Sequence, residues 1–168
     1  NCINSLNEQG YKKLVILDLS DNPKLADIEG VEKITTLQSL VLANDNLDDA
    51  KIEKIKTLTE LTTLNINGNQ IENIGVISNM PKLKYLYFNN NKVQSLEPIK
   101  GKVFYDLEFT GNKIKDITPL TTHRTINNLK MDNNQIEDVT VLSRISMSNE
   151  QNLSLAGQKI VKILENIP

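Results

Sequence analysis

The chain has 168 residues, a formal net charge of −2 at pH 7 and 39% hydrophobic residues. These values fit one domain with a modest core, and they exclude the basic footprint of a nucleic-acid-binding protein. No apolar run approaches the length that spans a bilayer, and the single cysteine, Cys2, excludes an internal disulfide.

The first segment, residues 1–13, contains Ile3, Leu6 and Tyr11 but no strand pattern. We expect it to be an N-terminal cap or a truncated repeat. Because the chain begins at Asn1 without a methionine, we also expect it to be a processed form or an excised domain.

From residue 14 onward one apolar pattern recurs. In LTTLNINGNQIENI, residues 61–74, apolar residues occupy positions 1, 4, 6, 11 and 14, and an asparagine occupies position 9. The same pattern begins at residues 14, 37, 61, 83, 104, 126 and 150, so the period is 21–24 residues. One unit cannot bury its own apolar side chains, but stacked units can. The consensus L-x-x-L-x-L-x-x-N-x-L therefore predicts a leucine-rich repeat domain of about seven repeats over residues 14–168.

Each unit is expected to begin with a short strand, x-L-x-L-x, and the stacked strands to form a parallel concave sheet. Positions 1, 4, 6, 11, 14 and 17 should point into the core. The residue at position 9 should turn the chain and satisfy backbone groups with its side-chain amide. The predicted ladder is Asn22, Asp45, Asn69, Asn91, Asn112, Asn134 and Gln158. Slightly altered turns are expected at Asp45 and Gln158.

The rest of each unit crosses the convex side in segments that are too short for full α-helices. Pro98 and Pro119 both occupy position 16, which suits an extended or 3₁₀ start. The predicted class is thus an α/β solenoid: a short-repeat leucine-rich repeat with a parallel concave sheet and a 3₁₀ or extended convex side.

Two longer stretches resemble the repeats of internalins and internalin-like surface proteins of Gram-positive bacteria. They are LTTLNINGNQIENIGVISNMPKLKYLYFNNNKVQSLEPIKG and NKIKDITPLTTHRTINNLKMDNNQIEDVTVLSRI. The resemblance implies a secreted or wall-attached protein whose concave face binds a host protein, with an immunoglobulin-like or other flanking domain after Pro168. The repeat consensus is shared more widely, including with a cytosolic regulator of protein phosphatase 1.

Sequence motifs of catalysis are missing. The one histidine, His123, stands on the convex side far from Cys2, and no phosphate-binding glycine loop, C-x-x-C or H-E-x-x-H occurs. We therefore expect no enzyme activity, no cofactor and no metal site.

The remaining functional surface is the concave face, where positions 3, 5 and 7 point outward. Tyr85 and Tyr87 are the aromatic residues at these positions, and exposed tyrosines are typical interface anchors. They could equally cover the sheet by packing on their neighbours. Glu108 and Lys130 could pair with each other. The predicted partner-binding residues are Tyr85, Tyr87, Glu108, Lys130, Asn65 and Asp106.

Three functions agree with these features. The first is a non-catalytic protein-recognition domain of a bacterial cell-surface adhesin, which binds a protein ligand on the concave sheet. The second is an intracellular scaffold that regulates an enzyme such as a phosphatase, in the cytoplasm. The third is a spacer that presents a neighbouring domain, for example one that captures haem or a host protein.

Overall fold

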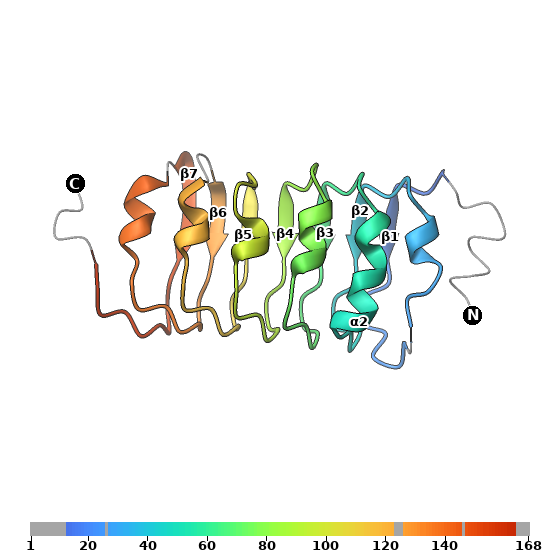
Figure 1. The fold of residues 1–168 in the computed structure, drawn as a ribbon, viewed down its shortest axis with the longest axis horizontal. Coiled ribbons are helices and arrows are strands. Elements are labelled where there is room, and N and C mark those ends of the chain that lie inside the picture. The colour runs from blue at the N-terminus through green and yellow to red at the C-terminus, as the bar shows by residue number, and fades with distance from the viewer. Residues whose placement is uncertain (1–12, 26, 123–125, 146, 164–168) are drawn as a thin grey trace.

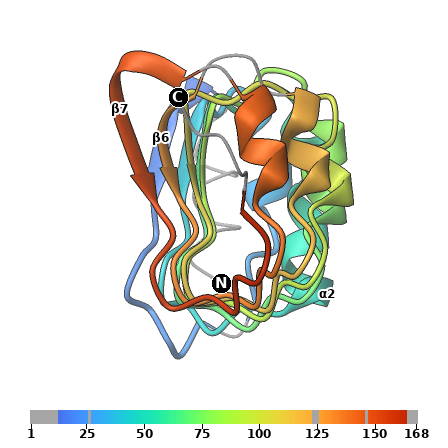
Figure 2. The ribbon, with the colours of Figure 1, turned by 90° about the vertical axis from the view of Figure 1, so that its left-hand side faces the viewer.

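The computed structural model describes residues 13–25, 27–122, 126–145 and 147–163. The chain forms an elongated stack of coils, with a strand of each coil on one side and a short helix on the other (Figure 1; Figure 2). In chain order the elements are β1 (Ile16–Asp18), η2 (Val31–Lys33), β2 (Ser39–Val41), α2 (Asp49–Ile52), η3 (Glu53–Thr57), β3 (Thr63–Asn65), η4 (Gly75–Asn79), β4 (Tyr85–Tyr87), η5 (Glu97–Ile99), β5 (Asp106–Glu108), η6 (Thr118–Thr122), β6 (Ile126–Lys130), η7 (Thr140–Arg144) and β7 (Met147–Ser154), where η denotes a 3₁₀ helix. The strands form one parallel sheet in the order β1 to β7, which confirms the predicted solenoid.

The strands pair in register, so that equal positions of successive units are neighbours. Position 4, for example, forms one row across the sheet: Leu17, Leu40, Leu64, Leu86, Leu107, Leu129 and Leu153. In the three-residue strands the middle residue is buried and its two neighbours turn outward. This alternation follows from the two-residue period of a strand, and it separates the core face from the outer face of the sheet.

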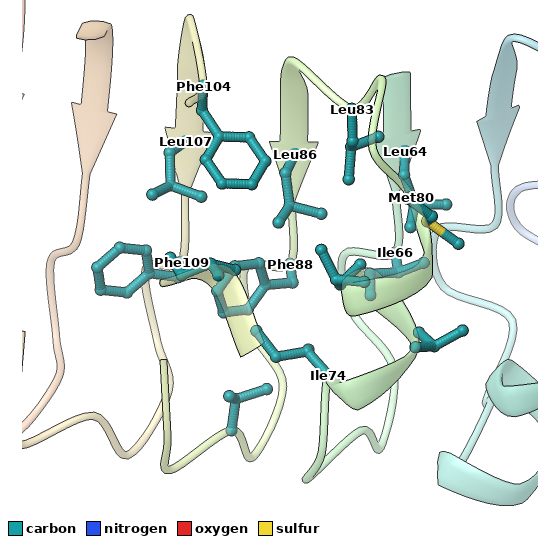
Figure 3. Packing of buried hydrophobic residues seen from close by; sticks show 14 of the residues in the cluster. Leu64, Ile66, Ile74, Met80, Leu83, Leu86, Phe88, Phe104, Leu107 and Phe109 are labelled. Carbon is teal, nitrogen blue, oxygen red and sulfur yellow. The ribbon is translucent and has the colours of Figure 1, made fainter. Parts of the chain in front are cut away.

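One continuous hydrophobic core fills the space between the sheet and the helices. Figure 3 shows its central part, where Leu64, Leu86 and Leu107 approach the core from three successive strands. The rings of Phe88 and Phe109 are stacked, with centroids 5.5 Å apart and planes inclined by 14°. Because both phenylalanines stand at position 6, this contact joins two units directly.

The residues at position 9 form the predicted ladder, as Asn91 illustrates. Its Nδ2 donates to the carbonyls of Ile66 and Phe88 at 2.9 and 3.1 Å, and its Oδ1 accepts from the amide of Ile71 at 3.1 Å. The corresponding side chains of Asn69, Asn112 and Asn134 are also buried and make equivalent bonds. Each asparagine therefore bonds its own turn to the preceding unit.

Asp45 is the departure that the sequence predicts. Its Oδ1 accepts from the amide of Asn22 at 2.7 Å, but its Oδ2 is buried and has no hydrogen-bond partner among the described residues. A carboxylate has no N–H to donate, so it cannot reproduce the bonds that an asparagine makes there.

The convex side carries 3₁₀ helices, as predicted, with one exception in the second unit. There α2 makes a full α-helical turn, and the side chain of Asp48 caps it by accepting from the amide of Lys51 at 3.0 Å. The core positions shift with it: Ala50 and Glu53 are exposed, whereas Ile52 and Ile55 are buried. The prediction of core positions 14 and 17 is therefore wrong for this unit, because the helical turn presents different residues to the core.

The C-terminal end of the repeat array differs from the prediction, and the structure does not describe most of the N-terminal segment. β7 begins at Met147, before the expected repeat start at residue 150, and the register slips between Ile126 and Asn128 of β6. Residues 1–12 of the proposed cap lie outside the described residues. Among those described, no helix is long and apolar enough to cross a membrane.

Candidate functional site: the outer face of the sheet

We use the name sheet face for the outward-pointing residues at positions 3, 5 and 7 of the units. All six residues predicted to bind a partner lie on it. Register places Tyr85 beside Asp106, and it places Tyr87 between Asn65 and Glu108. Lys130 follows Glu108 in the same row. The structure thus gathers the six residues on β3 to β6.

Glu108 is the centre of a polar network on the sheet face. Its Oε1 lies 3.2 Å from the ammonium of Lys130 and accepts from Nδ2 of Asn128 at 2.7 Å. Its Oε2 accepts from Nδ2 of Asn89 at 3.0 Å. The expected Glu108–Lys130 pair is confirmed, and two asparagines that the sequence analysis did not include complete it. The ion pair and the hydrogen bonds fix the positions of all four side chains.

Burial alone would raise the pKa of Glu108. The hydrogen bonds from Asn89 and Asn128, together with the ammonium of Lys130, outweigh burial and lower that pKa below its ordinary value. Glu108 is therefore a carboxylate at neutral pH. Because its oxygens already have three partners, it is poorly placed to attract a further cation.

Tyr87 is the half-buried aromatic residue of the sheet face. Its hydroxyl donates to Oδ2 of Asp106 at 3.1 Å. Burial raises the pKa of this hydroxyl well above its ordinary value, and the negative charges of Asp106 and Glu108 raise it further. Tyr87 therefore remains protonated and keeps its hydrogen bond at physiological pH.

Tyr85 lies in an aromatic contact that the sequence analysis missed. Its ring is 5.9 Å from that of Tyr105, with an interplanar angle of 56°. Both residues are exposed, with 36% of Tyr85 and 42% of Tyr105 accessible to solvent. Tyr105 occupies position 2, just before β5, and Tyr85 occupies position 3 of the preceding unit. Because these positions are close in adjacent units, their spacing in the sequence could have indicated the contact.

Asn65 has a more local role than the other predicted residues. Its Oδ1 accepts from the amide of Asn67 at 3.0 Å, so the side chain supports the turn that follows β3. Asn67 and Asn89 continue this pattern, because each accepts a hydrogen bond from an amide in the next unit at 2.6 and 2.7 Å. A row of side chain–backbone bonds thus fixes this border of the sheet face.

Surface hollows lie away from these residues. One is lined by Asp116, Glu137 and neighbouring residues, and a second by Asp49, Glu72 and their neighbours. Within the described part of the chain, no group of three histidine, cysteine, aspartate or glutamate side chains is arranged to hold a metal ion. His123 lies outside the described residues.

Comparison with known proteins supports the solenoid fold of stacked repeats. Residues 59–101 match the family model for leucine-rich repeats in two copies. Adenylate cyclase of Neurospora crassa is 32% identical over 80 residues, which is 48% of this chain but 4% of that protein. Overall the chain spans 4–40% of the length of the curated relatives that it matches.

Two solved structures resemble this one closely. Internalin C2 of Listeria monocytogenes has a TM-score of 0.68 and 29% identity, over 84% of this chain and 61% of that one. A second Listeria monocytogenes internalin, inlF, has a TM-score of 0.70 and 23% identity over 95% of this chain and 59% of that one, which establishes likeness of fold. The in-register parallel sheet, the asparagine ladder and these matches together show that the chain has the fold of a leucine-rich repeat solenoid.

Proposed function

We propose that this chain is a non-catalytic recognition domain that binds a protein on its sheet face. The observation that carries the proposal is the grouping of Tyr85, Tyr87 and Tyr105 with bonded polar side chains on the central strands. Tyrosines combine a large apolar ring with a polar tip, and they are enriched at protein interfaces.

The polar network supports the proposal through preorganisation. Glu108 is held by Lys130, Asn89 and Asn128, and Asp106 accepts a bond from Tyr87. Side chains that are already fixed lose less conformational entropy when a partner binds. The sheet face is also broad and lies apart from the hollows described above, which suits a protein surface better than a small molecule.

We further propose that the chain belongs to a bacterial cell-surface adhesin and is secreted or surface-attached. The resemblance to internalins in sequence pattern and in structure supports this part of the proposal. A flanking domain after Pro168 belongs to the same proposal.

The test uses a displayed library of mammalian extracellular domains, panned against the chain, and then one enriched domain as the probe. The Tyr85→Ala, Tyr87→Ala double variant should weaken its binding by about 2–4 kcal/mol. The control is Glu137→Ala, because Glu137 is exposed and lies outside the sheet face, on the convex side of the solenoid. Thermal melts check that the variants remain folded.

A contrary result would separate this function from its alternatives. If Glu137→Ala weakens binding and the tyrosine variant does not, the recognition surface is on the convex side. If panning enriches no domain that binds the sheet face, a spacer function becomes the better account.

A further inference from the structure

Asp106 is a carboxylate near the centre of the sheet face, and it forms no ion pair with the described residues. Its Oδ2 accepts a hydrogen bond from the hydroxyl of Tyr87 at 3.1 Å. Its Oδ1 accepts no hydrogen bond from the described residues, and none of their ion pairs involves Asp106. The carboxylate is half-buried on β5, so its charge is only partly solvated.

Glu108 and Asp132, the other two carboxylates of the sheet face in units five and six, have more partners among the described residues. Glu108 is paired with Lys130 and bonded by two asparagines. Asp132 accepts from the hydroxyl of Ser154 and from the amide of Ala156, at 2.6 Å in each case to Oδ1. Asp106 therefore stands out as the carboxylate with an oxygen available to a partner.

Two tyrosines neighbour Asp106, Tyr85 across the strand pair and Tyr105 along the chain. Tyr85 is the register partner of Asp106, so ring and carboxylate stand on the same face of strands that are roughly 4.8 Å apart. The ring of Tyr105 contacts that of Tyr85, and both are exposed. The face of a tyrosine ring attracts cations, and a carboxylate beside it strengthens that attraction.

The charges of the sheet face favour a positively charged partner. Among the described residues at positions 3, 5 and 7, four carboxylates face one ammonium: Asp18, Asp106, Glu108 and Asp132 against Lys130. Lys84, at position 2 beside this face, donates to the carbonyl of Val103 at 3.3 Å, and the ion pairs of the described residues do not include one between Lys84 and Asp106. Opposite charge on a partner would complement this surface.

We propose that Tyr85, Tyr105 and Asp106 form a seat for an arginine side chain of the protein partner. In this arginine seat the guanidinium lies against the exposed rings and donates to Oδ1 of Asp106, while Tyr87 holds Oδ2. Arginine fits better than lysine because its planar group both stacks on a ring and donates to a carboxylate. The inference rests on the proposed function and adds the chemistry of the partner.

The test titrates the whole chain with N-acetyl-arginine amide and follows backbone amides by NMR. The uncharged citrulline analogue, which has nearly the same shape, is the matched probe. Arginine should shift the amides of Tyr85, Tyr105 and Asp106 in a saturable way, about tenfold more tightly than citrulline, as expected for a partly exposed ion pair with a cation–π contact.

Two variants locate the effect. Asp106→Asn keeps the shape of the side chain and should reduce the affinity for the arginine probe to that for citrulline. Tyr105→Leu keeps an apolar contact for Tyr85 and should also weaken binding severalfold. Asp132→Asn is the matched control, because it removes a sheet-face carboxylate that is already bonded, and it should leave binding unchanged.

Several outcomes would overturn the inference: equal binding of the two probes, arginine binding that survives Asp106→Asn, shifts that map outside the arginine seat, or an equal loss in Asp132→Asn. None of them decides whether the sheet face binds proteins, because that is measured with the displayed domain and the Tyr85, Tyr87 variant. Loss of the domain's binding in the tyrosine variant, together with indifference to Asp106→Asn, would remove the arginine seat alone.

Discussion

Asp45 stands at position 9, where four later units have asparagine. One atom, its Oδ2, explains why this aspartate lowers the stability of the fold. Asn69, one unit further, donates from Nδ2 to the carbonyls of Leu42 and Ile66 at 2.8 and 3.0 Å. Asp45 has Oδ2 in place of such a donor, and this oxygen is buried without a partner among the described residues. A buried unpaired polar atom costs about 1–3 kcal/mol.

We predict that Asp45→Asn raises the free energy of unfolding by about 1–2 kcal/mol at neutral pH, because the amide supplies the missing donor. The reciprocal change Asn91→Asp should lower it by a similar amount. Urea unfolding of both variants and the wild type measures the differences. An Asp45→Asn variant no more stable than the wild type would show that Oδ2 is satisfied in solution.

The raised pKa of Asp45 also makes the stability of the fold depend on pH. Burial raises the pKa of Asp45 above its ordinary value of 3.8; the amide of Asn22 partly opposes this, and the charges of Asp21 and Asp18 add to it. A carboxyl whose pKa is higher in the folded state stabilises the fold below its unfolded pKa and loses that contribution as pH rises through the folded one. The stability advantage of Asp45→Asn over the wild type should therefore grow as the pH rises above about 4 and through the raised folded-state pKa.

At the scale of elements, each strand depends on the next unit for part of its hydrogen bonding. The amides at positions 6 and 8 donate forward: those of Phe109 and Gly111 reach carbonyls of the following unit at 2.8 Å. The corresponding amides after β7 are those of Leu155 and Gly157, and no described residue accepts from them. The outer edge of β7 is therefore an unpaired sheet edge within the described chain.

Hydrogen exchange should reveal this difference. We predict that the amides of Leu155 and Gly157 exchange roughly a thousandfold faster than those of Phe109 and Gly111, because only the latter need an opening of the sheet. The sample must be shown to be monomeric by sedimentation. Equal protection in a monomer would mean that part of the chain outside the described residues covers β7, whereas equal protection only in a dimer would indicate pairing between edges.

At the scale of the whole molecule, the core is continuous but not equally deep. Leu86 and Leu153 occupy the same position in units four and seven, yet Leu86 is fully buried and Leu153 is 42% exposed. Each repeat contacts only its neighbours, so the stability of a solenoid is shared between adjacent units. A substitution in the core of a central unit therefore weakens its packing against two neighbours.

We predict that Leu86→Ala lowers the free energy of unfolding by about 2–5 kcal/mol, and Leu153→Ala by less than about 1 kcal/mol. Urea melts followed by circular dichroism measure both changes. Similar losses in the two variants would show that unit seven is packed as tightly as unit four.

Much of this architecture follows from local patterns that the sequence displays directly. The repeat period determined the number of strands, and the two-residue strand period determined that Tyr85, Tyr87 and Glu108 point outward. The ladder could be read from position 9, because an asparagine needs only its own turn and the adjacent unit to make its bonds. The altered bonding of Asp45 was predictable for the same reason.

What the tertiary structure decided depends on how far side chains reach between units. The bonds of Asn89 and Asn128 to Glu108, and the approach of Tyr105 to Tyr85, join residues on neighbouring strands, and the repeat pattern does not specify their side-chain orientations. In the second unit, the capped turn of α2 moved Ile52 and Ile55 into the core in place of the expected positions. The sequence alone therefore determined the solenoid and the face that is available for recognition. The packing between units decided which groups on that face are already bonded and which, like Oδ1 of Asp106, remain available, because hydrogen bonding and burial depend on neighbours that lie some twenty residues away along the chain.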